Sequence, residues 1–400
     1  MGSDELLPIG RRVAYWRGRR KLSQQVFADR LGKSKSWVDK VERGVRSLDK
    51  VSTLQNIAAV LRIDTAVLFN GDTRSAEATA RAVGVERIRA ALSRYETAMQ
   101  RPAGHRPVLP PGRLIPQVAH AWTAFRHARY EQVIDLLPDL LGDAERTHAV
   151  GPEAGRVPLV EAYRITAALL VKLGDADLAW LAADRAMIAA AADRVLVAAA
   201  AMQLGQALRA CGWARTAKSA MLAAAYRIAP PVIEFGLPPE LSLCGTLLVQ
   251  AALAAARLGD GAAMAELIDE AAELAARVGE GHDHYRTGFG PAAVDLARCV
   301  AAAELGDVWE AVAQHKQVTQ QDGWRWLPPE HRAAHLIDAA RAYLHTDDPA
   351  NAGRLLVEVD CTAPAEIRHR PMARDLLVQV VRDPRAPAAA VRLAIALGVG

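Results

Sequence analysis

The sequence predicts an all-α protein in which a small N-terminal domain of five short helices precedes an α-solenoid, an array of stacked helical hairpins. Apolar residues recur at helical spacing along the 400 residues, which are rich in alanine, the strongest helix former. Two short helical segments flank a glycine turn between residues 23 and 44. Breaks with glycines at 174, 212, 259 and 306 are 38, 47 and 47 residues apart, a spacing typical of solenoid repeats.

The two segments around the N-terminal glycine turn should each begin at a serine. Ser23 is suited to cap a helix over 24–31, and Gly32 supplies the left-handed backbone that a tight helix end needs. Ser34 is suited to cap a second helix over 35–43. This arrangement is a helix-turn-helix, and its second helix has the width and the positive charge to enter the major groove of DNA.

Three further short helices should complete this domain, over residues 9–21, 50–61 and 65–69. Apolar side chains at helical spacing should face its core, at Ile9, Val13 and Trp16 in the first helix and at Val51, Leu54, Ile57, Ala58 and Leu61 in the fourth. Five short helices around one core make a domain of small but sufficient size.

This segment resembles the lambda-repressor-like helix-turn-helix of the XRE family of transcription regulators. The likeness covers roughly the first seventy residues. It lies in SQQ at 23–25, Phe27-Ala28, Gly32, SKSWV at 34–38, Glu42-Arg43-Gly44 and IDTAVLFNG at 63–71. The resemblance implies an ion pair between Arg17 and Glu42 that fastens the first helix to the second helix of the motif.

The resemblance also implies which residues touch DNA. Lys35, Ser36 and Lys40 match the family's base-reading positions, and lysine can donate to guanine O6 and N7. Gln24 should touch a phosphate and could reach a base, whereas Trp37 either covers a thymine methyl or packs into the domain, and we favour packing. The other residues expected at the interface, chiefly on the DNA backbone, are Gln25, Lys33, Ser34, Arg43, Arg46 and Lys50. One such domain reads few base pairs, so specific binding to double-stranded DNA predicts a homodimer on a two-fold site.

The charge distribution agrees with a nucleic-acid-binding N-terminal domain. Residues 1–70 hold 14 Lys and Arg against 7 Asp and Glu, whereas the remaining chain holds 35 against 38. Positive charge therefore gathers where the DNA-reading helix is expected, as in proteins that bind phosphate backbones.

Cysteine usage and the N-terminus predict a cytoplasmic protein. The four cysteines (Cys211, Cys244, Cys299 and Cys361) are far apart and form no CxxC pair, so we expect buried free thiols rather than disulfides or a zinc site. The start, MGSDELLPIG, is acidic and lacks the hydrophobic region of a signal peptide. No apolar run approaches the roughly 20 residues that a membrane helix needs, so no membrane partner is expected.

A linker should separate the two domains. We place the DNA-binding domain at 1–71, the linker at 72–112 and the repeat domain at 113–400. Residues 86–99 should form a linker helix, and residues 101–112 hold four prolines, which stop helices and favour extended chain.

The repeat domain should consist of six hairpins and a terminal pair of helices. The breaks are LGD at 173–175, 258–260 and 305–307, CG at 211–212 and HTDD at 345–348. The hairpins are expected at 114–147, 157–192, 194–229, 240–279, 290–322 and 329–360, and a terminal pair at 364–397 should cap them. Trp122, Phe125 and Tyr130 in the first hairpin resemble the start of a tetratricopeptide repeat. Trp324 and Trp326 are expected to fill a space between repeats.

Stacked hairpins curve, and the concave face that results commonly holds a peptide or a helix. The combination with an XRE-like domain resembles peptide-sensing regulators of quorum sensing and XRE regulators that accompany secondary-metabolite clusters. Groove asparagines bind the peptide backbone in the peptide-sensing relatives, but Asn351 is the only asparagine here after residue 113. The effector therefore stays open between a peptide and a small molecule.

The irregular segment 279–291 should form one wall of that concave groove. Arg286 could bind a carboxylate there and Phe289 an apolar group, with His284 beside them. The HxH at 282–284 lacks a third ligand, so no metal is expected. His315, His331 and His335 lie in amphipathic helices and should be exposed or packed rather than catalytic.

No phosphate-binding GxxxxGK[ST], GxSxG or HExxH motif occurs, so nothing in the sequence supports an enzyme, and no cofactor is expected. The sequence predicts a homodimeric, sequence-specific transcription regulator whose repeats sense a small molecule or peptide. The alternative is a protein-interaction scaffold whose repeats bind a partner protein, with DNA binding secondary.

Overall fold

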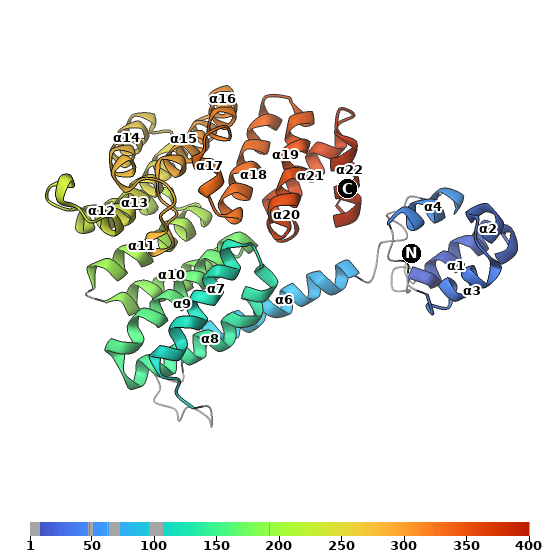
Figure 1. Cartoon of the computed structure of the whole chain (residues 1–400), viewed down its shortest axis with the longest axis horizontal. Coiled ribbons are helices and arrows are strands. Elements are labelled where there is room, and N and C mark those ends of the chain that lie inside the picture. The colour runs from blue at the N-terminus through green and yellow to red at the C-terminus, as the bar shows by residue number, and fades with distance from the viewer. Residues whose placement is uncertain are drawn as a thin grey trace. The chain divides into compact units, whose positions relative to one another are not determined.

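The structure is a computed structural model that describes residues 9–46, 48, 51–61, 63, 73–95, 107–191 and 193–399. All regular secondary structure in these residues is helical, which confirms the all-α prediction (Figure 1). Contacts divide the chain into one unit of Met1–Val83 with Val391–Gly400 and a second unit of Gly84–Ala390. We call the part of the first unit that contains α1 to α4 the head, and the second unit the repeat domain.

The helices of the head agree with the prediction to within two residues. They are α1 (Ile9–Arg19), α2 (Gln24–Leu31), α3 (Lys35–Glu42) and α4 (Val51–Leu61). The hydroxyls of Ser23 and Ser34 accept hydrogen bonds from backbone amides of the helices that they precede, and Gly32 has a left-handed φ of 65°. The turn residues therefore act as their chemistry predicts. The fifth predicted helix, 65–69, lies outside the described residues.

The head has one small hydrophobic core. Its fully or nearly fully buried side chains are Val13, Phe27, Ala28, Leu31, Val38, Ile57, Ala58 and Leu61. Trp16 and Trp37 are partly buried against this core, whereas Ile9 is only half-buried. At Gly10, a Cβ atom would lie 2.1 Å from the backbone oxygen of Val41. Helix α1 therefore crosses the end of α3 too closely for any side chain at position 10.

The linker helix differs from its prediction. Helix α6 spans Thr73–Leu92 rather than 86–99, so it begins earlier and ends earlier. The polar segment before residue 86 looks like a linker, but it is rich in alanine and continues the helix. Ile88 and Leu92 are fully buried, and a Cβ at Gly84 would lie 2.2 Å from the side chain of Ile134. From Gly84 onward, α6 is thus part of the packed repeat domain.

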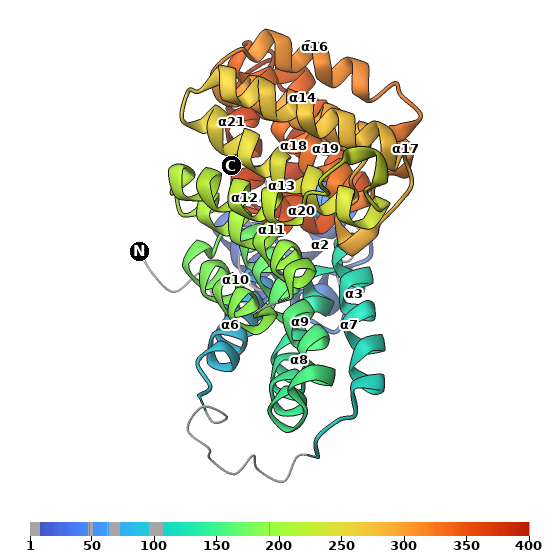
Figure 2. The ribbon, with the colours of Figure 1, turned by 90° about the vertical axis from the view of Figure 1, so that its left-hand side faces the viewer.

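Each of the six predicted hairpins is a pair of adjacent helices (Figures 1 and 2). The pairs are α7 (Pro111–Arg126) with α8 (Tyr130–Val150), α9 (Pro152–Leu173) with α10 (Ala176–Ala190), α11 (Arg194–Ala210) with α12 (Ala214–Ile228), α13 (Pro238–Arg257) with α14 (Gly261–Val278), α15 (Pro291–Leu305) with α16 (Val308–Val318), and α18 (Pro329–His345) with α19 (Pro349–Thr362). Short helices η1 (Ile233–Phe235), η2 (His284–Arg286) and α17 (Gly323–Trp326) lie between some of them. Consecutive hairpins stack, so this part of the chain is a helical solenoid.

The LGD breaks work as combined stop and start signals. The glycine of each break adopts a left-handed φ, at 82° for Gly174, 75° for Gly259 and 91° for Gly306. The aspartate that follows accepts a hydrogen bond from a backbone amide in the first turn of the next helix. One residue therefore ends a helix and its neighbour begins the next. At the HTDD break, Asp347 takes the left-handed conformation (φ 59°) and Asp348 caps the next helix.

The end of the array differs from the predicted terminal pair. Three helices follow α19, namely α20 (Pro364–His369), α21 (Pro371–Arg382) and α22 (Ala388–Leu397). Pro371 ends α20 after six residues, because the residue before a proline is disfavoured in helical conformation. The expected pair of packed tryptophans is also only half correct. Trp324 lies edge-on to His335 with ring centroids 5.6 Å apart, but Trp326 is 69% exposed.

Helix α13 is long and apolar enough to span a membrane by length and composition alone. It is the one such helix among the described residues, and 83% of its apolar window is buried inside the protein. Its composition is therefore explained by its place in the repeat core. All four cysteines are free, as predicted, but only Cys244 and Cys299 are buried, and Cys361 is exposed.

The solenoid curls until its first two hairpins touch its last helices, α7 against α18 and α9 against α20 (Figure 2). A cluster of buried charged and polar side chains joins them. The hydroxyl of Tyr130 donates a hydrogen bond to Glu366, and Lys172 forms ion pairs with Glu330 and Glu366. We call Tyr130, Lys172, Glu330 and Glu366 the closure cluster.

The segment 279–291 contacts the first two hairpins, and its expected role as one wall of a concave groove stays a prediction. Asp283 pairs with Arg126 of α7, and the buried guanidinium of Arg164 of α9 donates to the backbone oxygen of Tyr285 at 2.9 Å. The segment therefore connects the fourth and fifth hairpins to the first two.

Candidate nucleic-acid interface

Helix α3 has one face in the core of the head and the opposite face in solvent. Val38 and Val41 are at most 1% exposed. Because successive residues turn by about 100° around a helix, Ser36, Lys40 and Arg43 lie on the opposite side, with Lys35 at its edge. These four side chains are exposed. The outer face of α3 therefore carries three cations and a hydroxyl, together with the carboxylate of Asp39, which pairs with Arg43.

An ion pair holds α3 against α1. The Nε of Arg17 donates to Oε1 of Glu42 at 2.5 Å, and a terminal nitrogen of the same guanidinium donates to Oε2 at 3.0 Å. A second guanidinium nitrogen donates to the backbone oxygen of Leu22 at 2.7 Å. Glu42 is 6% exposed, so this is a buried, two-point pair with well-defined geometry. The predicted pairing of Arg17 with Glu42 is confirmed.

Gln24 takes part in the same pair. Its amide nitrogen donates to Oε2 of Glu42 at 2.8 Å, and its side chain is half-buried. One N–H of the amide is thus used by Glu42, which leaves the second N–H and the amide oxygen for other partners. The contact with a DNA phosphate that we expect of Gln24 stays a prediction.

The remaining predicted contact residues lie at the surface of the head, with two exceptions. Gln25, Lys33, Ser34, Lys35, Ser36, Lys40, Arg43 and Arg46 are exposed. Trp37 is half-buried against the core, and the ammonium of Lys33 lies 6.0 Å from its ring centroid. Lys50 lies outside the described residues. The structure thus brings most of the predicted set onto or beside α3, and their contacts with DNA stay predictions.

The electrostatics of this surface favour an anionic partner. Residues 33–46 contain five basic side chains and two acidic ones. Glu42 is buried in its pair with Arg17, and Asp39 pairs with Arg43 at 2.5 Å. Among the described residues, no acidic side chain pairs with Lys35 or Lys40. Their charges therefore remain available to phosphates or to guanine O6 and N7.

Of the ligand residues predicted in the repeat domain, Phe289 is buried, whereas the roles of Arg286 and His284 stay predictions. Phe289 is 3% exposed and belongs to the hydrophobic core, where its ring packs on Gly245 so closely that a Cβ there would lie 2.0 Å away. The sequence could not show this burial, because the partner glycine lies on another hairpin. Arg286 lies 3.8 Å from Asp283, and the ring of His284 stacks on His282 at 5.5 Å. Burial, followed by the neighbouring His282, lowers the pKa of His284.

His315 of the fifth hairpin and His335 of the sixth are packed, whereas His331 is partly exposed. Nδ1 of His315 lies 3.0 Å from Nε2 of His335, and both side chains are buried. Burial lowers the pKa of His315 to about 4 and that of His335 to about 3, so both rings are neutral near pH 7. No group of three or more His, Cys, Asp or Glu side chains suited to a metal occurs in the described part of the chain.

Sequence analysis missed a cavity of about 440 Å³ in the repeat domain, lined by α8, α9, α10 and the residues after α6. Its polar residues come from four separate segments, and none belongs to a recognisable motif.

Comparisons with known proteins agree with the geometry of the head. Two solved structures resemble the chain weakly. One is BtubC (BKLC) from P. vanneervenii, with 19% identity over 64% of this chain and 94% of that chain and a TM-score of 0.39. The other is Bacillus thuringiensis PlcR in complex with the peptide PapR7 and DNA, with 14% identity over 80% of this chain and 100% of that chain and a TM-score of 0.26. No curated protein is significantly similar to the chain. Residues 8–68 match a protein family described as a helix-turn-helix domain, so the chain carries such a domain at its N-terminus.

Proposed function

We propose that the protein is a sequence-specific, homodimeric transcription regulator that binds DNA through α3 and acts in the cytoplasm. Its repeat domain senses a small molecule or a peptide. The observation that carries the proposal is the outer face of α3, where Lys35, Ser36, Lys40 and Arg43 are exposed while the opposite face is fixed in the core. The proposal includes no catalytic activity and no cofactor.

The chemistry of α3 suits the DNA major groove. A single α-helix fits that groove, and lysine and serine can bond to base edges there. Arg43, Arg46 and Lys33 flank these side chains and would contact phosphates, which position a protein without specifying sequence. The buried pair of Arg17 and Glu42 fixes the angle between α1 and α3, so the base-reading side chains are held before DNA arrives.

The homodimer follows from the size of this surface. One helix with three or four base-directed side chains reads only a few base pairs, which is too few to select one site in a genome. Two heads on a two-fold DNA site double the number of base pairs that are read.

The continuity of α6 supports sensing. This helix begins at Thr73 and extends into the packed part of the repeat domain, where Ile88 and Leu92 are fully buried. An effector that binds one arrangement of the α6 end more tightly than another would shift the population of the two. Because linked binding is reciprocal, the effector would change the affinity of the protein for DNA by the same factor by which DNA changes its affinity for the effector.

The test is fluorescence anisotropy of the full chain with labelled fragments that tile the DNA upstream of its gene and its neighbours. Scrambled fragments of equal length and composition serve as controls. We expect one fragment to bind at least about a thousandfold more tightly than its scrambled control, with an affinity that falls steeply as salt rises. No binding to any fragment at about 50 mM salt, where phosphate contacts are strong, would overturn the proposal.

The number of chains on the bound fragment tests the homodimer separately. Sedimentation equilibrium with the selected fragment should give two chains for each DNA duplex. One chain for each duplex at saturation would contradict the dimer while leaving DNA binding intact.

A further inference from the structure

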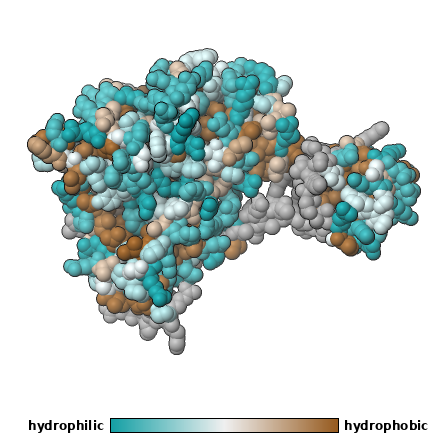
Figure 3. Space-filling model, viewed as in Figure 1, coloured by the Kyte–Doolittle hydropathy of each residue, from teal (hydrophilic) through white to brown (hydrophobic). Residues whose placement is uncertain are grey.

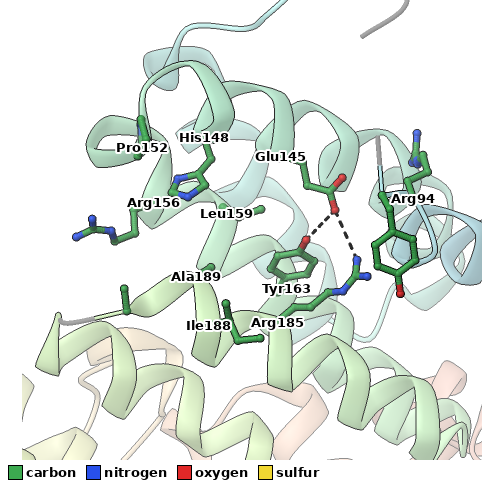
Figure 4. A pocket seen from close by; sticks show the side chains of 12 residues that line it. Arg94, Glu145, His148, Pro152, Arg156, Leu159, Tyr163, Arg185, Ile188 and Ala189 are labelled. Carbon is green, nitrogen blue, oxygen red and sulfur yellow. Dashed lines mark hydrogen bonds and ion pairs between the residues drawn. The ribbon is translucent and has the colours of Figure 1, made fainter. Parts of the chain in front are cut away.

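The cavity of about 440 Å³ in the repeat domain has a shape and a lining that suit a small ligand (Figure 4). Helices α8, α9 and α10 form its walls, and Arg94 and Tyr95, which follow the end of α6, form one side. Its volume falls within the range of about 300–1,000 Å³ that is typical of small-molecule sites.

The middle of the cavity is apolar. Leu159 of α9 and Ile188 and Ala189 of α10 line it, and Figure 4 shows them between Arg156 on one side and Arg185 on the other. Ile188 is 70% exposed, although a large aliphatic side chain is usually covered. Figure 3 shows hydrophobic patches on the surface at the lower left of the repeat domain, where α8 to α10 lie in Figure 1. A ligand in the cavity would cover part of this apolar surface.

Two guanidinium groups in the cavity have unused donors. No hydrogen bond or ion pair joins Arg156 to another described residue. Arg185 forms a long ion pair with Glu145, at 4.0 Å and without a hydrogen bond, and its guanidinium lies 5.3 Å from the ring centroid of Tyr95. Guanidinium groups bind carboxylates and related anions through two parallel hydrogen bonds.

The single acidic side chain of the cavity is already occupied. The hydroxyl of Tyr163 donates to Oε1 of Glu145 at 2.7 Å. Burial raises the pKa of Glu145, although the hydrogen bond from Tyr163 and the charges of Arg185 and Arg94 act in the opposite direction. The cavity therefore contains more positive charge than negative, and its surplus lies on Arg156 and Arg185.

We infer that this cavity binds a small organic anion with an apolar body, such as an aromatic or aliphatic carboxylic acid. The anionic group would pair with Arg156, assisted by the charge of Arg185, and the apolar body would cover Leu159, Ile188 and Ala189. This inference deepens the sensing part of the proposed function by naming the site and the ligand class.

The position of the cavity would link the ligand to the connecting helix. Arg94 donates to the backbone oxygen of Pro138 in α8 at 2.8 Å, which fastens the chain directly after α6 to the repeat domain. Tyr95 stands next to it against Arg185. A ligand that lies beside Arg185 would therefore contact the residues that immediately follow α6.

The test uses two fluorescent probes of nearly equal shape. The anionic probe is 1-anilinonaphthalene-8-sulfonate, and the neutral probe is N-phenyl-1-naphthylamine. The full chain should bind one anionic probe per chain at this site, about tenfold more tightly than the neutral probe, as expected for one charge-assisted hydrogen bond. Naphthalene-1-acetate should displace the probe, and naphthalene-1-acetamide should not.

Three variants locate the site. Arg156→Gln should weaken the anionic probe about tenfold and leave the neutral probe unchanged, and Ala189→Phe should weaken both by filling the cavity. Arg215→Gln, which removes an exposed arginine of α12 outside the cavity, is the matched control and should change neither. Circular dichroism melting checks that each variant is folded. Equal binding of both probes, or unchanged binding in both cavity variants, would overturn the inference without affecting DNA binding.

Discussion

The ammonium group of Lys172 lies 2.8 Å from Oε1 of Glu366, which joins the second hairpin of the solenoid to its last helices. Glu330 is a second ion-pair partner, and Glu366 has no exposed surface. Burial alone would lower the pKa of Lys172, but the carboxylates of Glu330 and Glu366 outweigh it and raise that pKa. The lysine is therefore charged inside the protein, and it holds the curled solenoid closed.

Lys172→Met should strongly destabilise the repeat domain, because the buried Glu330 would lose its lysine partner and Glu366 would keep only Arg370. We expect a loss of about 3–5 kcal/mol in the free energy of unfolding. Lys218→Met is the matched control, since Lys218 pairs with Asp260 at 2.7 Å near the surface and should contribute at most about 1 kcal/mol. Urea titration of both variants measures the difference, and equal losses would contradict a special role for the closure cluster.

The closure cluster also predicts acid sensitivity. Burial opposes the charge of Glu330, but Lys172 lowers its pKa to about 2, below its ordinary value near 4.5. A depressed carboxylate pKa contributes stability that is present above pH 4.5 and is lost as the pH falls toward 2. Unfolding followed by circular dichroism between pH 5 and pH 2 should show this loss. An equal free energy of unfolding at pH 5 and at pH 2 would show that Glu330 does not pair with Lys172 in solution.

The stacked pair His315 and His335 should make stability fall at a milder pH. Burial lowers both pKa values, to about 4 and about 3, whereas an unfolded histidine has a pKa near 6.5. The unfolded chain therefore binds protons that the folded protein does not. The contribution of the two rings to the free energy of unfolding is complete above pH 6.5 and should fall by roughly 5 kcal/mol by pH 4.5. Urea titrations at pH 7 and pH 4.5 measure this loss. His335→Met should reduce the change in the free energy of unfolding between pH 7 and pH 4.5. If that change is the same in the variant, groups other than these histidines cause it.

Glu42→Gln should loosen the head alone. The change removes the carboxylate from a buried two-point pair with Arg17, so we expect a loss of about 2–4 kcal/mol in the head. Asp39→Asn is the matched control, because its pair with Arg43 is exposed and should contribute at most about 0.5 kcal/mol. Hydrogen exchange of the backbone amides in α1 and α3 should become faster in Glu42→Gln but not in Asp39→Asn. Unchanged exchange rates in Glu42→Gln would show that the pair with Arg17 does not hold these two helices together.

Much of the head and the hairpin pattern could be predicted from sequence, because their signals are local. Ser23, Gly32 and the LGD breaks determine the conformation of their own backbone, whatever surrounds them. The closure between Lys172 and Glu366 could not be predicted, since it depends on small rotations that add up over six hairpins.

Two other features depended on packing that no local signal records. Phe289 fills a space left by Gly245 on another hairpin, so it is buried instead of offered to a ligand. The cavity at Arg156 and Arg185 is formed by residues of three helices and of the segment after α6. Residue spacing in one helix says nothing about such a gap.

The most direct test of the central claim, that α3 lies in a groove of DNA, is the DNA affinity of the double variant Lys35→Gln, Lys40→Gln. Arg11→Gln, which removes one exposed charge from α1, is the control. In fluorescence anisotropy, the double variant should bind the selected fragment at least about tenfold more weakly than the unaltered protein, because each base contact contributes about 1–3 kcal/mol. Its affinity for the scrambled fragment should fall by less. If the double variant binds both fragments as tightly as the unaltered protein, α3 does not contact DNA and the account is wrong.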